Sequence, residues 1–180
     1  MHEIQEIGFK KIDGATATLA DYQGKVALIV NVASKCGLTP QYEALEKLYR
    51  LKKAEGLEIL GFPANNFLEQ EPGSDAEIQD FCSVTYDVTF PIFSKISVAG
   101  DDKHPLYQEL IKAQPERIGE GPWWKDLVEY GLTPNPKPEV LWNFEKFLVN
   151  RRGEVIARFA PDITAEDPRL LESIEIALAE

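Results

Sequence analysis

The chain has 180 residues, of which 44% are hydrophobic and 27% charged, a composition typical of a single globular domain, 1–180. Its net charge of −11 argues against nucleic acid and anionic membrane surfaces as partners, because both are bound through clustered lysine and arginine. The first residues lack the apolar core of a signal peptide, and no run reaches the ~20 apolar residues of a membrane span. We therefore expect a cytoplasmic protein with no stable membrane association.

The cysteines and histidines are few. With two cysteines, Cys36 and Cys82, the chain has no disulfide framework. The two histidines, His2 and His104, do not have the spacing of zinc ligands. We expect neither a metal nor a cofactor.

Hydrophobic patterns predict alternating strands and helices along the chain. Successive apolar residues indicate strands covered on both faces, and apolar residues three to four apart indicate helices. In chain order, the expected elements are a hairpin at 9–19, a strand at 25–34, a helix at 40–56, a strand at 57–63, helices at 75–82 and 104–113, a hairpin at 144–159 and a helix at 167–180. This order predicts an α/β protein of thioredoxin-like fold, with a mixed central sheet flanked by helices and an N-terminal hairpin.

Capping residues refine these boundaries. Thr39 is the expected N-cap of the helix that begins at Pro40, and Ser74 or Asp75 caps the helix at 75–82. The segment 114–140 holds five prolines and three glycines, which predicts an irregular insertion. The apolar residues expected to form the buried stripe of the helix at 40–56 are Ala44, Leu45, Leu48 and Leu51.

Cys36 stands between the strand at 25–34 and the helix at 40–56. The free N–H groups and the dipole of a helix N-terminus stabilise a thiolate, and Lys35 adds a positive charge next to it. Thr39 occupies the position of the second cysteine in a CxxC motif, so a dithiol exchange motif is excluded. The alternative is a cysteine packed as a small hydrophobic residue.

The loop at 63–73 follows the second buried strand. Because the carboxyl ends of parallel strands meet at one edge of a sheet, we expect this loop to lie beside Cys36. Gln70, if it points inward, could donate a hydrogen bond to a sulfur anion, as could the Trp142 indole and the Asn143 amide. Alternatively, Trp142 is a core residue. The other polar residues of the loop are expected to face solvent: Asn65, Asn66 and Glu69.

Four motifs, NVASKCGLTPQY, FPANNFLEQEPGS, VTFPIFSKI and LWNFEKFLV, resemble those of the glutathione peroxidase family, particularly its cysteine-containing bacterial members. The resemblance covers nearly the whole chain. It implies a thioredoxin-like fold and the reduction of hydroperoxides by a tetrad that would be Cys36, Gln70, Trp142 and Asn143. In this interpretation the Cys36 thiolate attacks the peroxide and becomes a sulfenic acid.

The sequence departs from the family at Ala64, where FPCNQF is usual and FPANNF stands here. Cys82 is then the only second thiol, and thioredoxin-dependent members carry a resolving cysteine in this helical region, although the spacing differs by one residue. The alternative is a buried cysteine beside Phe81. The insertion, with Trp123 and Trp124, resembles the longer connection of oligomeric members.

The expected reductant is thioredoxin rather than glutathione. Glutathione is anionic, and Lys35 is the only basic residue in the two motifs nearest Cys36. One alternative function uses the same residues: a peroxide-sensing relay that would pass the oxidation of Cys36 to a client protein. A second alternative is a scaffold that has lost the chemistry, and the intact tetrad argues against it.

Overall fold

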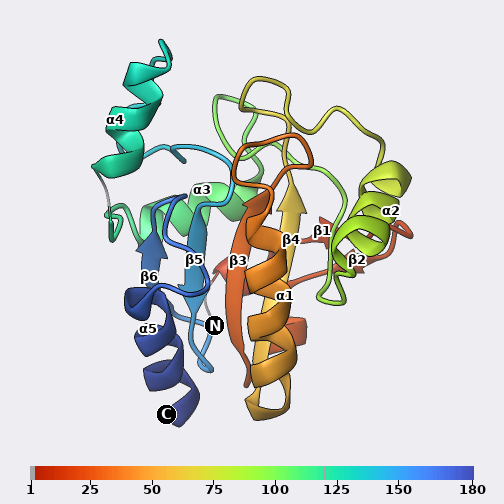
Figure 1. Ribbon diagram of the computed structural model, residues 1–180. Helices are drawn as coiled ribbons and strands as arrows, with labels where there is room; N and C mark the ends of the chain where they lie inside the picture. The colour runs from red at the N-terminus through yellow and green to blue at the C-terminus, as the bar shows by residue number, and fades with distance from the viewer. Residues whose placement is uncertain (1–2, 120) are drawn as a thin grey trace.

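The computed structural model describes residues 3–119 and 121–180, so His2 lies outside the described residues (Figure 1). The strands are β1 (Phe9–Lys10), β2 (Thr16–Ala17), β3 (Val26–Val32), β4 (Leu57–Pro63), β5 (Lys146–Val149) and β6 (Val155–Phe159). The α-helices are α1 (Gln41–Lys52), α2 (Asp75–Tyr86), α3 (Pro105–Ala113), α4 (Pro122–Glu129) and α5 (Pro168–Ala179). Short 3-10 helices are η1 (Glu3–Glu6), η2 (Leu19–Tyr22) and η3 (Lys53–Glu55).

The central sheet is mixed, as the sequence predicts. Its four strands follow the order β4-β3-β5-β6, with β3 parallel to β4 and antiparallel to β5, and with β5 antiparallel to β6. The expected N-terminal hairpin is formed by β1 and β2. Because β3 and β4 are parallel neighbours, the segments that follow them leave the sheet at the same edge.

Two apolar layers cover the sheet. Side chains of α1, α2 and α5 pack against one face, which presents Leu28 and Val30 of β3. The other face presents Ala27 and Ile29 and is covered by α3 and the N-terminal segment. Successive side chains of β3 point to opposite faces of the sheet. Because both faces are buried, the strand is apolar at nearly every position. Figure 1 shows α1 and α5 lying side by side over the sheet.

The details of α1 correct two expectations. Pro40, and not Thr39, is the N-cap, because the Thr39 hydroxyl instead donates to the carbonyl of Ala33. The buried stripe does not include Leu51, whose side chain is 69% exposed. Tyr42 and Tyr49 face the sheet in its place, so two aromatic residues rather than a leucine complete the contact.

Helix α2 is longer than expected. Ser74 caps it in a reciprocal capping box with Glu77, as one of the two predicted caps. The helix continues to Tyr86 rather than ending at Cys82, and it stops at Asp87, which adopts the left-handed conformation with φ 52°. Cys82 therefore lies within the helix and not at its end.

The segment 114–140 is not irregular throughout, because it contains α4, which projects from the body of the molecule (Figure 1). Pro122 occupies the first turn of α4, where its missing N–H is not required.

Within residues 3–119 and 121–180, none of the helices combines the length and apolar character needed to cross a membrane. His104 caps α3, accepting from the N–H of Leu106.

Candidate active site

Cys36 lies in a tight turn between β3 and α1. Its backbone N–H donates to the Thr39 hydroxyl at 2.9 Å, and that hydroxyl donates to the Ala33 carbonyl at 2.8 Å. The N–H of Leu38 donates to the Cys36 sulfur at 3.3 Å. The side chain is 8% exposed. The turn thus holds a largely buried sulfur against a backbone donor.

The loop that follows β4 lies against this turn, as the sequence predicts. The N–H of Lys35 donates to the Gln70 carbonyl at 3.0 Å, and the N–H of Ser34 donates to the Glu71 carboxylate at 3.1 Å. Leu68 and Glu69 both adopt the left-handed backbone conformation, with φ 54° and 52°. These two residues turn the loop back toward the end of β3, which brings Gln70 against Lys35, the residue before Cys36.

Asn143 and Trp142 come from the turn before β5, so they precede the strand rather than starting it. The side-chain amide of Asn143 donates to Gln70 Oε1 at 2.9 Å. Trp142 packs against Phe67 with ring centroids 5.2 Å apart and also against the apolar cluster that contains Cys36. Its carbonyl accepts from the Asn31 side chain at 3.1 Å. The structure therefore brings the four predicted residues to one edge of the sheet.

A buried ion-pair network fastens the turn that carries Trp142 and Asn143. Glu145 accepts from the N–H of Leu141 at 2.9 Å and from Arg158 Nε at 2.7 Å. Arg158 also donates to the Pro138 carbonyl at 2.8 Å and to carbonyls at the start of the insertion. The side chains of Glu145 and Arg158 are fully buried. This network was not predicted from the sequence, although a glutamate inside the apolar run NFEKFLV is the signal that indicates it.

Glu71 is a second residue that sequence analysis missed. It is 1% exposed, and burial raises the pKa of its carboxyl group, an effect opposed by its hydrogen bond to Ser34 and by the charges of Lys95 and Lys35. Its backbone N–H donates to the Asn65 side chain at 2.9 Å. Asn65 therefore organises the loop rather than simply facing solvent.

Asn66 is also more ordered than expected, because its exposed side chain bonds to the segment before α3. It donates to the Ser97 hydroxyl at 3.0 Å and to the Ala99 carbonyl, and it accepts from the N–H of Val98 at 2.8 Å. Glu69 is exposed, as predicted.

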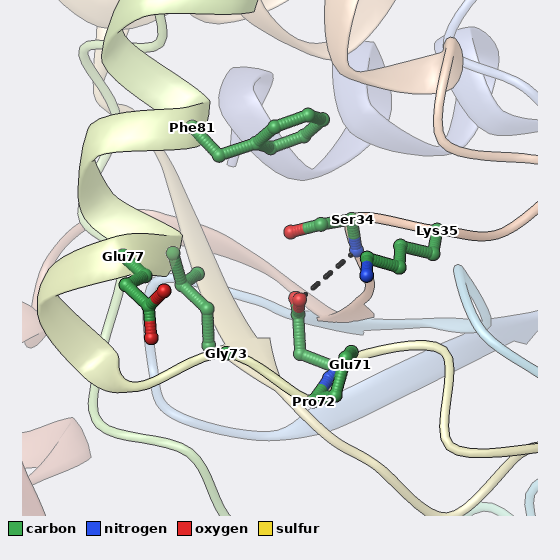
Figure 2. A pocket seen from close by; sticks show the side chains of 8 residues that line it. Ser34, Lys35, Glu71, Pro72, Gly73, Glu77 and Phe81 are labelled. Carbon is green, nitrogen blue, oxygen red and sulfur yellow. Dashed lines mark hydrogen bonds between the residues drawn. The ribbon is translucent and has the colours of Figure 1, made fainter.

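A pocket of about 250 Å³ opens between α2 and the two loops. Figure 2 shows Phe81 and Glu77 of α2 on one side of it, opposite Ser34 and Glu71. The full lining is Ser34, Lys35, Glu71, Pro72, Gly73, Glu77, Ile78 and Phe81. The pocket thus separates the turn before Cys36 from the helix that carries Cys82.

Cys82 faces inward from α2 and is fully buried. Burial raises the pKa of its thiol to about 11, with the nearby charge of Glu71 adding to the effect and Tyr42 opposing it. Cys82 and Cys36 belong to the same apolar cluster, and both are free thiols in this structure. The Cys82 thiol therefore packs in the core and not at the surface.

Comparisons with known proteins agree with this architecture. Residues 4–111 match the family model described as glutathione peroxidase. The chain is 55% identical over 172 residues to the thioredoxin/glutathione peroxidase BtuE of Escherichia coli (strain K12), with 94% of each protein covered. It is 41% identical over 177 residues to the glutathione peroxidase homolog BsaA of Bacillus subtilis (strain 168), with 98% of each covered.

Solved structures show the same fold. The crystal structure of Trgpx in its apo form matches with a TM-score of 0.71 and 34% identity, covering 100% of this chain and 98% of that one. A thiol:disulfide interchange protein of Chlorobium tepidum TLS matches with a TM-score of 0.60 at 13% identity, covering 96% of this chain and 92% of that one, which is a likeness of fold alone. The predicted thioredoxin-like fold is confirmed, and the chain belongs to the glutathione peroxidase family.

Proposed function

We propose that this protein is a thiol peroxidase that reduces hydrogen peroxide and organic hydroperoxides through Cys36. The Cys36 thiolate attacks one peroxide oxygen, the O–O bond breaks, the sulfur becomes a sulfenic acid, and the other oxygen leaves as an alkoxide or hydroxide that takes up a proton. The observation that carries the proposal is the convergence of the Cys36 turn, with Leu38 N–H on the sulfur, and the hydrogen-bonded pair of Gln70 and Asn143.

The proposed role of Gln70, Trp142 and Asn143 is to donate hydrogen bonds to the sulfur anion and to the departing oxygen. One positioned donor of this kind is worth ~3 kcal/mol in a transition state that develops negative charge. The hydrogen bond from Asn143 to Gln70 Oε1 fixes the Gln70 amide and leaves its NH₂ group directed elsewhere. That orientation supports Gln70 as a donor rather than an acceptor.

Thioredoxin is the proposed reductant, with glutathione the competitor. The relative from Escherichia coli carries both reductants in its name. The cations near the loops are Lys35 and Lys95, and both act on the carboxylates Glu71 and Glu77. Because these charges are offset locally, the site lacks the cationic excess that would attract anionic glutathione.

Cys82 is the proposed resolving cysteine. Its thiol would attack the sulfenic acid of Cys36, forming the Cys36–Cys82 disulfide and releasing water. Two observations set the requirements of this step: the Cys82 thiol is fully buried, and its pKa of about 11 makes the thiolate scarce at neutral pH. A disulfide also requires the two α-carbons to come within about 7 Å. We propose that α2 unwinds around Cys82 to expose the thiol and let the bond form.

We further propose that residues 1–180 act as one domain, in the cytoplasm, as part of the response to oxidative stress. The alternative function, a peroxide-sensing relay, uses the same Cys36 chemistry but does not turn over. Because the relay would use the same Gln70, Asn143 and Trp142, only sustained turnover with a reductant separates the two functions.

Steady-state peroxide consumption tests these proposals. Wild type should consume hydrogen peroxide and cumene hydroperoxide with thioredoxin, thioredoxin reductase and NADPH, and more slowly with glutathione and glutathione reductase. Oxidation of Cys36 in a single turnover, with no sustained consumption by either reductant, would instead support the relay. A higher catalytic efficiency with glutathione would reverse the choice of reductant.

A further inference from the structure

Lys146 is a charged residue placed inside the core. It lies at the start of β5, and its side chain is fully buried on the face of the sheet covered by α1 and α5. Its ammonium nitrogen donates to Gln41 Oε1 at 2.7 Å and to the Pro161 carbonyl at 3.0 Å. The Gln41 amide donates to the same carbonyl at 2.7 Å. These three hydrogen bonds tie together β5, the first residue of α1 and the turn after β6.

The hydrogen bonds continue from Gln41 to the thiol. The backbone N–H of Gln41 donates to the Leu38 carbonyl at 2.9 Å, and the N–H of Leu38 donates to the Cys36 sulfur at 3.3 Å. Lys146 is thus linked to Cys36 through two residues of the turn that opens α1. The position of the Leu38 N–H relative to the sulfur depends on where this turn is held.

Stability alone does not account for a lysine at this position. Burying an ammonium carries a desolvation cost that hydrogen bonds repay only in part, and apolar replacements of buried charges are often neutral or stabilising. An apolar side chain would fill the same space in β5 without ordering Gln41. The polar connection itself is therefore the feature that needs explanation.

We propose that Lys146 is a positioning residue of the peroxidatic site, which, through Gln41, holds the Leu38 N–H on the Cys36 sulfur. This inference rests on the proposed role of Cys36 as the peroxidatic thiol. Lys146 acts through Gln41 and Leu38 and not by contact with the peroxide.

The charge of Lys146 gives this role a pH dependence. Burial lowers the pKa of Lys146 to about 7, and the carboxylates that oppose the shift are Asp162 in the turn after β6, Glu145 before β5 and Asp167 at the start of α5. Its partners on α1, β3 and β6 are uncharged residues: Gln41 at hydrogen-bond distance, and Val30 and Phe159 by strand register. The ammonium therefore changes its charge near neutral pH.

The size of the effect follows from the hydrogen bond that is disturbed. The Leu38 N–H donates to the reacting sulfur, and weakening a hydrogen bond to a charged group through loss of the Lys146–Gln41 contact should slow Cys36 on the order of tenfold. At pH values well above 7 the amine of Lys146 is uncharged, and its hydrogen bond to Gln41 is weaker.

The test measures Cys36 reactivity directly. Rates of alkylation of Cys36 by iodoacetamide, resolved from Cys82 by peptide mass spectrometry, are compared with second-order rates of oxidation by hydrogen peroxide from pH 5.5 to 9. The variants are Lys146→Met and Gln41→Met, alone and combined. Leu148→Ala is the matched control, because Leu148 is buried on the same face of β5 two residues later and its truncation costs stability without breaking the connection.

Lys146→Met should lower both rates about tenfold at pH 6.5 and remove an inflection near pH 7 from the wild-type profile. Gln41→Met should slow Cys36 similarly, and the double variant should show little further loss, since both substitutions break one connection. Leu148→Ala should unfold more easily but keep the wild-type rate per folded molecule. Circular dichroism establishes that each variant is folded, and Gln41→Met decides the question if Lys146→Met does not fold.

Equal alkylation rates in wild type, Lys146→Met and Gln41→Met across this pH range would overturn the proposal, as would an equal loss in Leu148→Ala. Failure of the peroxidase assignment is seen separately, as a wild-type protein that does not consume peroxide. The alkylation comparison remains decisive in that case, because it does not depend on peroxide.

Discussion

The buried charge of Lys146 predicts a specific pH dependence of stability. An ordinary lysine has a pKa of 10.5, and burial lowers the pKa of Lys146 to about 7 in the folded protein. Between these pH values the unfolded chain binds a proton that the folded chain does not. Unfolding then takes up a proton, so a rise in pH makes unfolding less favourable, and the free energy of unfolding increases. Below pH 7 both states carry the proton, so Lys146 no longer makes the free energy of unfolding depend on pH, and the destabilisation by the buried ammonium is largest there.

The magnitude follows from the two pKa values. Between pH 6.5 and pH 8.5, Lys146 should add about 2 kcal/mol to the free energy of unfolding. Lys146→Met removes the titrating group. The free energy of unfolding of wild type minus that of this variant should therefore rise by about 2 kcal/mol over the interval. Other groups with shifted pKa values, such as Glu71 and Cys82, are present in both proteins and cancel in the comparison.

Urea unfolding followed by far-ultraviolet circular dichroism at half-unit pH intervals measures both free energies. The reduced proteins are compared at constant ionic strength, and equal m-values establish that the same surface is exposed on unfolding. A difference between wild type and Lys146→Met that stays constant from pH 6.5 to 8.5 would show that Lys146 does not bury a neutral amine. A value of wild type minus variant that falls as the pH rises would contradict the predicted direction.

Three further predictions concern the chemistry. Cys36→Ser should abolish peroxide consumption, because an alcohol is not ionised near neutral pH and cannot form a sulfenic acid; steady-state turnover close to wild type would reject the assignment. Gln70→Ala and Trp142→Phe should remain folded but react with peroxide on the order of 10²–10³ more slowly in stopped-flow measurements; unchanged second-order rates would make both residues structural. One equivalent of peroxide should link Cys36 to Cys82 in non-reducing mass spectra, and Cys82→Ser should trap the sulfenic acid at Cys36. Sulfenic or glutathionylated Cys36 alone in the wild type would show that Cys82 is a packing residue.

Much of the frame of the site is readable from the sequence. The apolar strands at 25–34 and 57–63 and the helix between them predict a parallel pair, and a parallel pair places the Cys36 turn and the Gln70 loop at one edge. The strands are predicted from local apolar patterns. The meeting of the turn and the loop follows from the rule that parallel strands end at the same edge of a sheet. The contacts of Lys35 with Gln70 and of Ser34 with Glu71 confirm this neighbourhood.

Helix details were less predictable, because they depend on competing contacts. Thr39 has the side chain of a good N-cap, but its hydroxyl bonds within the Cys36 turn instead. Leu51 fits the periodic stripe, yet the larger rings of Tyr42 and Tyr49 occupy the buried face of α1. Helix α2 extends beyond the predicted end at Cys82. It ends only at Asp87, which adopts the left-handed conformation.

By itself, the sequence determined the order of strands and helices, the placement of Cys36 before a helix and the meeting of two loops, since these follow from apolar spacing and chain direction. Only the tertiary structure decided which charged residues lie inside. Glu145, Lys146 and Arg158 stand in strand-like sequence, and their partners are 4 to 105 residues away along the chain. A buried charge is tolerated where hydrogen-bond partners converge on it, and that convergence exists only once distant segments have packed together.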